Sequence, residues 1–400
     1  MSTAPPTADP EVGAGVRATY AAFISTGFAF ASWASRIPQV RDELHLEPSQ
    51  LGLVLLAIAA GSLIALPSSG ALVSRWGSRR VVSGMARLNG FGLAVVAVGY
   101  DFGVVWVVLG LFFFGFAQGA WDVAMNVQGA LVERRLGKAI MPRFHAGFSV
   151  GTVAGALSGA AMVALHIPVT AHLLVVGVLV ALLVPVLVRR FIPDSSAHAG
   201  DESVSKGSTL RAWRERRTLL IGVFVLAFAF AEGTGNDWTS IALIDGYATS
   251  AFVGTLGFAV FLAAMTAGRW FGPAWLDRWG RVVVMRVMTV VSLAGVLVFV
   301  FGGVTWVAFV GAVLWGAGLS LGFPVGMSAG ADEPAMAAPR VSVIASIGYC
   351  AFLTGPPVVG FLGDHLTVLR SVTAVAVLLA LAFLLAGQAE PAHSNPTDSA

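Results

Sequence analysis

The chain has 400 residues, of which 57% are hydrophobic and 11% charged, and its mean hydropathy is +0.83. Soluble domains carry roughly 25% charged residues, so this composition excludes a water-soluble protein and indicates that lipid surrounds the chain. The formal net charge of +3 is spread over several short polar segments, which excludes a nucleic-acid-binding face. The single cysteine, Cys350, permits no internal disulfide.

Long apolar segments dominate the sequence. A helix that crosses the hydrocarbon core needs about 20 mostly apolar residues. Twelve segments meet this length: 17–37, 50–72, 81–100, 104–131, 143–165, 168–189, 218–243, 250–272, 282–301, 304–327, 340–363 and 366–387. The sequence therefore predicts an all-α membrane protein with twelve transmembrane helices, six on each side of a hydrophilic stretch.

The expected domains follow from these spans. Residues 1–16 lack a basic segment and a cleavage site, so they indicate a cytosolic tail rather than a signal peptide. One six-helix bundle is expected over residues 17–189 and a second over residues 218–387. Residues 190–217 form a cytoplasmic linker that ends in a basic cluster, and residues 388–400 form a polar cytosolic tail.

Basic residues set the predicted orientation. With the N-terminus inside, only Arg36, Arg41 and Arg370 of the 24 lysines and arginines lie at the outer side. The opposite orientation places most basic residues outside, against the positive-inside rule. We therefore expect a multi-pass protein of the cell (inner or plasma) membrane with both termini in the cytoplasm.

A short phrase occurs twice. Residues 74–77 read Ser-Arg-Trp-Gly, and residues 277–280 read Asp-Arg-Trp-Gly, 203 positions later (277 minus 74). Each copy lies in a polar break between two apolar spans. A repeat at half the chain length indicates duplication of a membrane unit, and two-fold repeats of membrane helices are typical of secondary transporters.

The six-plus-six layout and the duplicated phrase resemble the major facilitator superfamily, over about 370 residues by topology. The superfamily's loop motif is Gly-x-Leu-Ala-Asp-Arg-x-Gly-Arg-Arg. Residues 70–80 read Gly-Ala-Leu-Val-Ser-Arg-Trp-Gly-Ser-Arg-Arg, and residues 273–281 read Pro-Ala-Trp-Leu-Asp-Arg-Trp-Gly-Arg. The resemblance implies two pseudo-symmetric six-helix bundles that rock around a midplane cavity lined by helices 1, 4, 7 and 10.

The resemblance also implies that this loop is a latch for the closed cytoplasmic side. An acidic residue near a helix N-terminus and arginines that pair across the two halves would hold it. Ser74 replaces the acidic residue in the first copy, which leaves Asp277 as the intact one. Alternatively, these are ordinary loop charges that set the orientation. The gating candidates are Arg75, Gly77, Arg79, Asp277, Arg278, Gly280 and Arg281.

Within the superfamily, the fourth span is similar to the fucose-permease-like branch, where an acidic residue is followed four positions later by Asn. Asp122 and Asn126 match that pattern. The first span differs from sugar carriers, because Trp33 and Arg36 stand where an acidic or amide residue is expected. Trp33 is a candidate solute contact, and Arg36 either grips an anionic solute group or extends to the outer headgroups.

Ionisable side chains at a helix centre cost roughly 2.5–3.5 kcal/mol on insertion scales and are functional by default. Asp122 is one clear case. Gln118, Asp122 and Asn126 share one helical face, which is expected to line the cavity. The alternative is a hydrogen-bond network that only holds the bundle together.

Glu232 in the seventh span is the second clear case. Gly233 and Gly235 weaken the helix there, and an interrupted helix at membrane depth points to a binding site. An unpaired carboxylate in an apolar setting favours the protonated form, which suits a proton carrier. Asn236 and Asp237 follow as solute contacts or outer-rim residues.

Glycines recur at every fourth position of the fifth span (Gly147, Gly151, Gly155 and Gly159). They leave a smooth groove on one helical face, so we expect this span to pack closely on a neighbour.

These features predict proton-coupled symport of a small polar solute, with sugar-like molecules among the candidates. Asp122 and Glu232 are the proton-coupling residues. Efflux of amphipathic compounds by proton exchange is one alternative, and a membrane sensor on a transporter fold is another. The sequence offers no metal-ligand cluster, nucleotide fingerprint or catalytic triad, so no metal, cofactor or enzyme activity is expected. The expected partners are the solute, protons and the lipid bilayer, without nucleic acid, and the expected state is a monomer.

Overall fold

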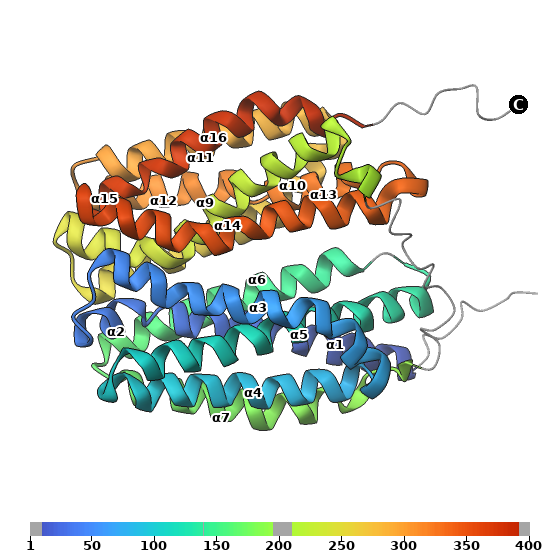
Figure 1. Cartoon of the computed structure of the whole chain (residues 1–400), viewed down its shortest axis with the longest axis horizontal. Coiled ribbons are helices and arrows are strands. Elements are labelled where there is room, and N and C mark those ends of the chain that lie inside the picture. Colours follow the sequence, from blue (N-terminus) through green and yellow to red (C-terminus); the bar gives the residue numbers. More distant parts are fainter. Residues whose placement is uncertain (1–9, 139, 195–209, 392–400) are drawn as a thin grey trace, which may run out of the picture. The chain divides into compact units, whose positions relative to one another are not determined.

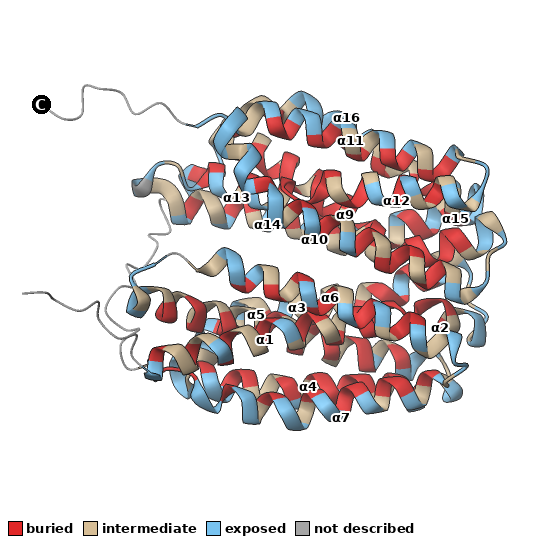
Figure 2. Ribbon diagram, turned by 180° about the vertical axis from the view of Figure 1, so that it is seen from behind, coloured by how far each residue is buried: buried red, intermediate tan, exposed pale blue. Residues whose placement is uncertain are grey.

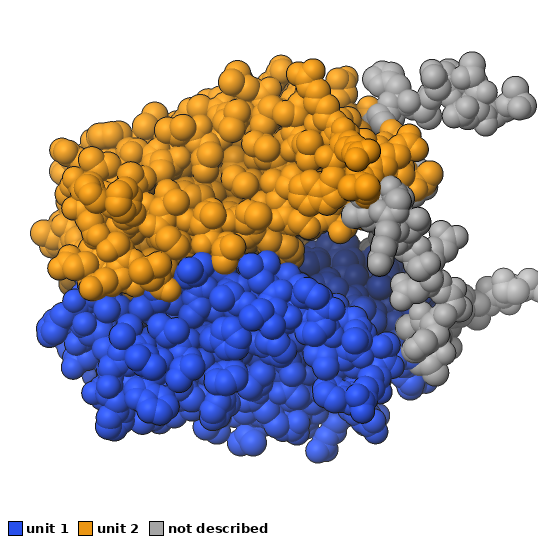
Figure 3. Space-filling model, in the orientation of Figure 1, with its two compact units in different colours: residues 1–46, 54–201 blue, residues 47–53, 202–400 orange. Residues whose placement is uncertain are grey.

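The computed structural model describes residues 10–138, 140–194 and 210–391. The chain forms two compact units, coloured separately in Figure 3: unit 1 contains residues 1–46 and 54–201, and unit 2 contains residues 47–53 and 202–400. All regular structure in the described ranges is helical (Figure 1).

The long helices follow the predicted spans. Unit 1 contains α1 (Pro10–Ala34), α2 (Ile37–Glu43), most of α3 (Pro48–Trp76), α4 (Ser78–Gly99), α5 (Val104–Leu136), α6 (Met141–Ala164) and α7 (Val169–Leu187). Unit 2 contains α9 (Arg216–Tyr247), α10 (Ala251–Trp279), α11 (Arg281–Phe301), α12 (Thr305–Leu319), α13 (Gly322–Gly330), α14 (Ala337–His365), α15 (Val368–Ser371) and α16 (Thr373–Leu385). Short 3₁₀ segments extend or connect several of them.

Eleven segments of the described chain are helices long and apolar enough to cross a membrane. Helix α1 is a twelfth long helix, and it begins at Pro10. The apolar pattern predicts the start of this span at residue 17, and the structure adds residues 10–16 to the helix. The rest of the expected tail, residues 1–9, lies outside the described residues. Hydropathy and length thus define a multi-pass membrane protein.

The duplicated phrase is also a duplicated structure. Helices α3 and α10 each have 29 residues, and both their starts (251 minus 48) and their ends (279 minus 76) are 203 positions apart. Each is followed by a glycine with positive φ, +77° at Gly77 and +76° at Gly280. Positive φ is readily adopted only by glycine, so the same turn is encoded twice. We call the end of each unit that carries this turn its motif end.

Close helix contact explains the glycine series in α6. A Cβ atom on Gly151 would lie 2.1 Å from the carbonyl oxygen of Ile24 in α1, and one on Gly155 would lie 2.5 Å from that of Phe28. The backbones of α1 and α6 therefore touch, which confirms the packing predicted from the four-residue spacing.

Buried residues lie inside each unit, and many apolar side chains are exposed on the outside (Figure 2). Leu182, Val377 and Leu384 are 64%, 71% and 74% exposed. An aliphatic outer surface on long helices fits contact with lipid chains. Helix α9 is the most enclosed of the spans, since 72% of its apolar window is buried, against 33% for the last span.

Candidate functional site

In unit 1, the polar side chains of α5 form a half-buried stripe. Gln118, Asp122 and Asn126 are all of intermediate exposure, whereas the intervening Trp121 and Met125 are buried. The Asn126 Nδ2 atom donates to the Asp122 carbonyl oxygen at 2.9 Å and to its Oδ1 at 3.3 Å. The face predicted from the helical period therefore exists, and it keeps Asp122 Oδ1 hydrogen-bonded within its own helix.

Gln118 connects this stripe to α1. The hydroxyl of Thr26 donates to Gln118 Oε1, and Gln118 Nε2 donates to the Thr26 carbonyl oxygen at 3.3 Å. Gln118 therefore forms a hydrogen-bond contact between helices, which is the packing role given above as the alternative to lining a cavity. Asp122 and Asn126 form hydrogen bonds only within α5 in the contacts described.

Gln128 lies on a different face of α5 and is fully buried. The Ser78 hydroxyl donates to Asp194 Oδ1 at 2.8 Å and accepts a hydrogen bond from the side-chain amide of Gln128 at 3.1 Å. Asp194 Oδ2 also accepts the Ser78 backbone N–H at 2.5 Å. Asp194 thereby caps the start of α4, beside the turn at Gly77, and Gln128 belongs to this motif-end cluster.

Arg36 and Trp33 lie at the other end of unit 1, and both are buried, at 2% and 1% exposure. Arg36 Nε donates to His172 Nδ1 at 3.0 Å, and its Nη2 donates to the Ile167 carbonyl oxygen at 3.0 Å. In this structure Arg36 ties the end of α1 to the start of α7 through these two contacts. The Trp33 indole N–H has no hydrogen-bond partner in the described chain.

In unit 2, α9 carries a second half-buried polar stripe. Glu232, Asn236 and Asp237 are of intermediate exposure, whereas Thr234 and Gly235 between them are buried. The Asn236 Oδ1 atom is buried without a hydrogen-bond partner among the described residues. Asn236, four positions after Glu232, therefore shares one helical face with it, and Asp237 lies at the edge of that face.

Glu232 is paired, contrary to the expectation of an unpaired carboxylate. Arg269 Nη2 in α10 lies 2.9 Å from Glu232 Oε1 and 3.0 Å from Oε2. Both side chains are about one-fifth exposed, at 22% for Arg269 and 19% for Glu232. Arg269 was missed because it lies near the end of an apolar span, where a basic residue was assigned to the inner membrane surface. The one sequence feature that could have indicated Arg269 is the long apolar segment of α10 that precedes it.

The interrupted helix is also not where the glycines predicted it. Helix α9 is continuous from Arg216 to Tyr247. The tenth span instead breaks between α12 and α13, at Ser320 and Leu321. Arg269 Nε lies 3.4 Å from the Ser320 carbonyl oxygen, so the same guanidinium touches both Glu232 and the break.

The motif loops have similar geometry in the two units. Arg75 lies over the ring of Trp76 at 6.0 Å from its centroid, and Arg278 lies over Trp279 at 5.2 Å. Arg79 and Asp277 are exposed. Within unit 2, Asp277 makes no ion pair or hydrogen bond among the described residues.

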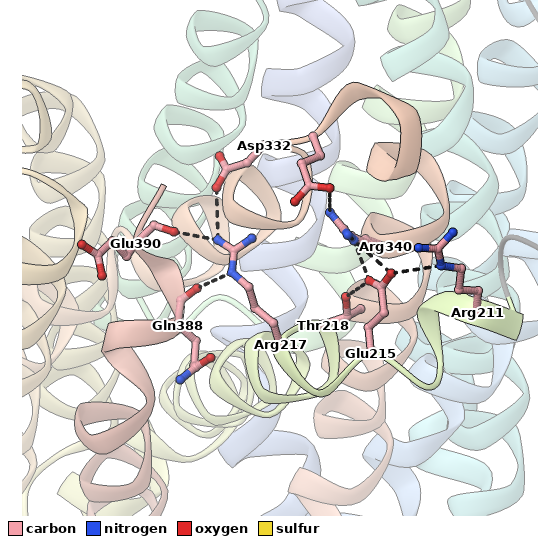
Figure 4. A network of polar contacts seen from close by, with 9 residues as sticks. Arg211, Glu215, Arg217, Thr218, Asp332, Arg340, Gln388 and Glu390 are labelled. Carbon is pink, nitrogen blue, oxygen red and sulfur yellow. Dashed lines mark hydrogen bonds and ion pairs between the residues drawn. The ribbon is translucent and has the colours of Figure 1, made fainter. Parts of the chain in front are cut away.

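Arg281, the last residue of the second motif copy, is held within unit 2. Its Nη1 donates to Asp332 Oδ1 at 2.7 Å, and its Nη2 donates to the Ser328 hydroxyl at 3.1 Å. Arg217 Nη2 donates to the other oxygen of Asp332 at 3.2 Å and to the Glu390 carbonyl oxygen at 2.6 Å (Figure 4). Asp332 therefore joins the motif, the start of α9 and the C-terminal segment.

Glu215 is the second centre of this motif-end network (Figure 4). Arg340 Nε donates to Glu215 Oε2 at 2.6 Å, and the Thr218 hydroxyl donates to the same oxygen at 2.9 Å. The hydrogen bond from Arg340 is the main cause that lowers the pKa of Glu215 below its ordinary value. The linker thus enters α9 through a fixed ionic contact.

A cleft of about 1160 Å³ opens at the opposite end of unit 2. Its polar lining includes Asp245, Tyr247, Thr305, Thr367 and Arg370. None of the residues singled out from the sequence as site residues lines it.

Comparisons with known proteins agree with this fold. The chain matches the family model described as Major Facilitator Superfamily over residues 19–338. It is 32% identical to the "Uncharacterized transporter y4wD" of Sinorhizobium fredii over 372 residues, which cover 92% of this chain and 97% of that protein.

Solved structures show the same fold at lower identity. The nucleoside transporter NupG is 14% identical with a TM-score of 0.76, covering 94% of this chain and 98% of its own. A variant of the E. coli Fucose:proton symporter FucP is 16% identical with a TM-score of 0.61, covering 93% of this chain and 98% of its own.

Proposed function

The chain belongs to the major facilitator superfamily of transporters, and on this basis we propose that it couples the movement of a small polar solute to that of protons, as a symporter that works by alternating access. The supporting observation is one half-buried polar stripe in each unit, each with a carboxylate near the middle of a long helix. Asp122 is residue 19 of 33 in α5 (122 minus 103), and Glu232 is residue 17 of 32 in α9 (232 minus 215).

In this proposal the two carboxylates carry the proton, and their neighbours bind the solute. Amide side chains both donate and accept hydrogen bonds, so Gln118, Asn126 and Asn236 suit a solute with several hydroxyl groups. Asp237, five positions after Glu232, adds an acceptor at the edge of this face of α9. Trp33 contributes to the solute path only in a state that uncovers it.

The motif ends of both units are proposed to face the cytoplasm, with both termini there and the protein in the cell membrane as a monomer. Basic residues gather at these ends, in agreement with the positive-inside rule. The gating residues of the motifs would then control access from the cytoplasm. Gly77 and Gly280 would hold the turn, and Arg281 would hold Asp332.

Transport into proteoliposomes tests the proposal. A panel of sugars and nucleosides, the solute classes named for the two structural relatives, is offered under an inward proton gradient. We expect uptake of at least one solute to stop when the gradient is dissipated. Asp122→Asn or Glu232→Gln should abolish gradient-driven uptake while solute exchange without a gradient continues.

Matched controls are Asp101→Asn and Glu43→Gln, which change exposed carboxylates outside the two stripes. Both should transport like the parent protein. Gradient-driven uptake that survives in both stripe variants would refute proton coupling through these residues. Export of a compound loaded inside the liposomes, driven by an inward proton gradient, would instead favour efflux by proton exchange.

A further inference from the structure

Asp237 is a carboxylate without a counter-charge, and it lies on the stripe that is proposed to bind the solute. We propose that the solute carries a protonated amine, and that Asp237 binds this ammonium group while Asn236 donates to a neighbouring acceptor of the solute. An amine-bearing solute is a narrower class than the small polar solute of the proposed function. Its assignment rests on that function only in taking the α9 stripe as a solute contact.

The position of Asp237 places it well inside the membrane span. It is residue 22 of 32 in α9 (237 minus 215). Ten residues (247 minus 237), or about 15 Å of helix, follow it before α9 ends. An ionised side chain this far from the end of a span is costly unless an opposite charge lies beside it. Asp237 therefore needs a positive partner to stay ionised.

No such partner for Asp237 exists among the described residues. Its carboxylate makes no hydrogen bond or ion pair with them. Arg269 of α10 binds Glu232 at 2.9 Å and has no contact with Asp237, and neither has Arg370 of α15. Helices α12, α13 and α16 carry no charged residue, and α14 carries its charged residues only near its two ends. The α9 stripe thus has one negative charge in excess.

A solute can reach the carboxylate of Asp237. Buried side-chain atoms without a hydrogen bond occur nearby, at the Thr234 hydroxyl, but the carboxylate oxygens of Asp237 are not among them. The side chain of Asp237 is of intermediate exposure. The next residue, Asn236, has its Oδ1 buried, so its Nδ2 is the end that a solute meets. A solute at this point therefore meets a charged acceptor and an N–H donor.

A protonated amine matches these groups better than a hydroxyl does. An ammonium group has donors, no acceptor and a full positive charge, so it supplies both hydrogen bonds and the missing counter-charge. A neutral hydroxyl leaves the negative charge uncompensated. Asp122 in unit 1 differs, because Asn126 Nδ2 already donates to its Oδ1 at 3.3 Å. Asp237 is accordingly the residue assigned to the amine.

Charge-matched thiol reagents test this assignment. Gly233→Cys places a thiol one turn before Asp237 on the same helical face, in a Cys350→Ser background that removes the exposed native thiol. The nearest group to the new Cβ is the ring of Phe352, at 3.3 Å. The purified protein reacts in detergent at neutral pH with the cationic aminoethyl methanethiosulfonate or with its neutral hydroxyethyl analogue. The ratio of the two rates is compared with the ratio for mercaptoethanol in solution, because this comparison cancels the intrinsic reactivity of the reagents.

We expect the ratio to favour the cationic reagent about tenfold over its value in solution. Asp237→Asn should abolish this preference, whereas Asp101→Asn, which changes an exposed carboxylate of unit 1, should keep it. Asn236→Cys is the second reporter position if Gly233→Cys does not fold. Equal ratios in the parent and in Asp237→Asn would overturn the inference, and so would a thiol that neither reagent modifies at either position.

Three sugars extend the test to solutes. Glucosamine, glucose and N-acetylglucosamine differ at one substituent, and only glucosamine can carry a positive charge. Glucosamine should slow the modification of the thiol by the neutral reagent, and Asp237→Asn should remove this protection. Equal protection by glucose or N-acetylglucosamine would contradict the amine requirement. Where no sugar protects, the reagent rates alone decide.

The two proposals fail in different ways. A cation preference that depends on Asp237, in a protein whose uptake ignores the proton gradient, supports the amine site and rejects symport. Gradient-driven uptake of a neutral solute, with equal reaction ratios in the parent and in Asp237→Asn, rejects the amine site and leaves symport intact.

Discussion

Arg269 in α10 and Glu232 in α9 form an ion pair in which one guanidinium nitrogen lies 2.9 Å and 3.0 Å from the two carboxylate oxygens. The residues are 37 positions apart and join consecutive spans of unit 2. Both side chains are about four-fifths buried, so removal of one partner is expected to destabilise the protein more than the loss of a surface salt bridge does. The pair places a carboxylate and an arginine together near the middle of the long apolar helix α9.

The ion pair predicts strongly non-additive stability effects. Glu232→Gln or Arg269→Gln alone removes one partner of the pair, whereas the double variant removes both. We expect a coupling free energy of about 1–3 kcal/mol in a double-mutant cycle, measured by thermal unfolding in detergent. The combination of Glu232→Gln with Arg286→Gln should be additive, and a coupling near zero in the first cycle would show that the pair does not form.

The two motif glycines should respond differently to substitution. Alanine at either position is forced into a positive φ with extended ψ, a region essentially restricted to glycine, at a cost of about 1–3 kcal/mol. At Gly77 the new Cβ would also lie 2.7 Å from Asp194 Oδ2, whereas at Gly280 it meets no atom within 4 Å. Gly77→Ala should therefore lower the unfolding temperature more than Gly280→Ala does. Gly70→Ala in the same loop motif, with no neighbour within 4 Å, is the control, and equal effects of the first two would disprove the Asp194 contact.

The α1–α6 contact predicts a steric effect. A Cβ at Gly151 would lie 2.1 Å from the Ile24 carbonyl oxygen, so Gly151→Ala must separate the two backbones. Overpacking of this kind costs about 1–3 kcal/mol. Gly84→Ala in α4, where no atom lies within 4 Å, should be neutral or slightly stabilising, and thermal unfolding of the two variants compares them directly.

Glu215 predicts a pH-dependent contribution to stability. Its pKa is lowered in the folded protein by the Arg340 hydrogen bond, so it adds stability above its ordinary value of 4.5 and loses it as the pH falls through the folded pKa. Glu215→Gln should lower the unfolding temperature at neutral pH, at a cost of about 1 kcal/mol or less. The same substitution should have little effect in acid below the folded pKa. A destabilisation independent of pH would contradict the ionic role.

The span pattern and the repeat could be predicted because they depend on local properties. Hydropathy over about 20 residues identifies a membrane helix without knowledge of its neighbours. The 203-residue offset, the polar stripe on α5 and the glycine groove of α6 depend only on sequence spacing. These features are present in the structure, at Gly77 and Gly280, along Gln118 to Asn126, and at Gly151.

Contacts between helices could not be predicted in the same way. The partner of Glu232 comes from another helix, and no spacing rule links Glu232 to Arg269. Gly235 looked like a helix breaker, but its missing side chain makes room for the ring of Phe261, 2.3 Å from where a Cβ would be. Packing keeps α9 continuous, and the break falls at Ser320 instead.

Proton movement on solute binding tests the central claim most directly. The purified protein in weakly buffered detergent is mixed with each solute of the panel while the pH is recorded. A symporter takes up a proton with its solute, so we predict a rise in pH that Glu232→Gln or Asp122→Asn abolishes and Glu43→Gln preserves. A fall in pH would indicate proton exchange, and solute binding with no pH change would contradict proton coupling.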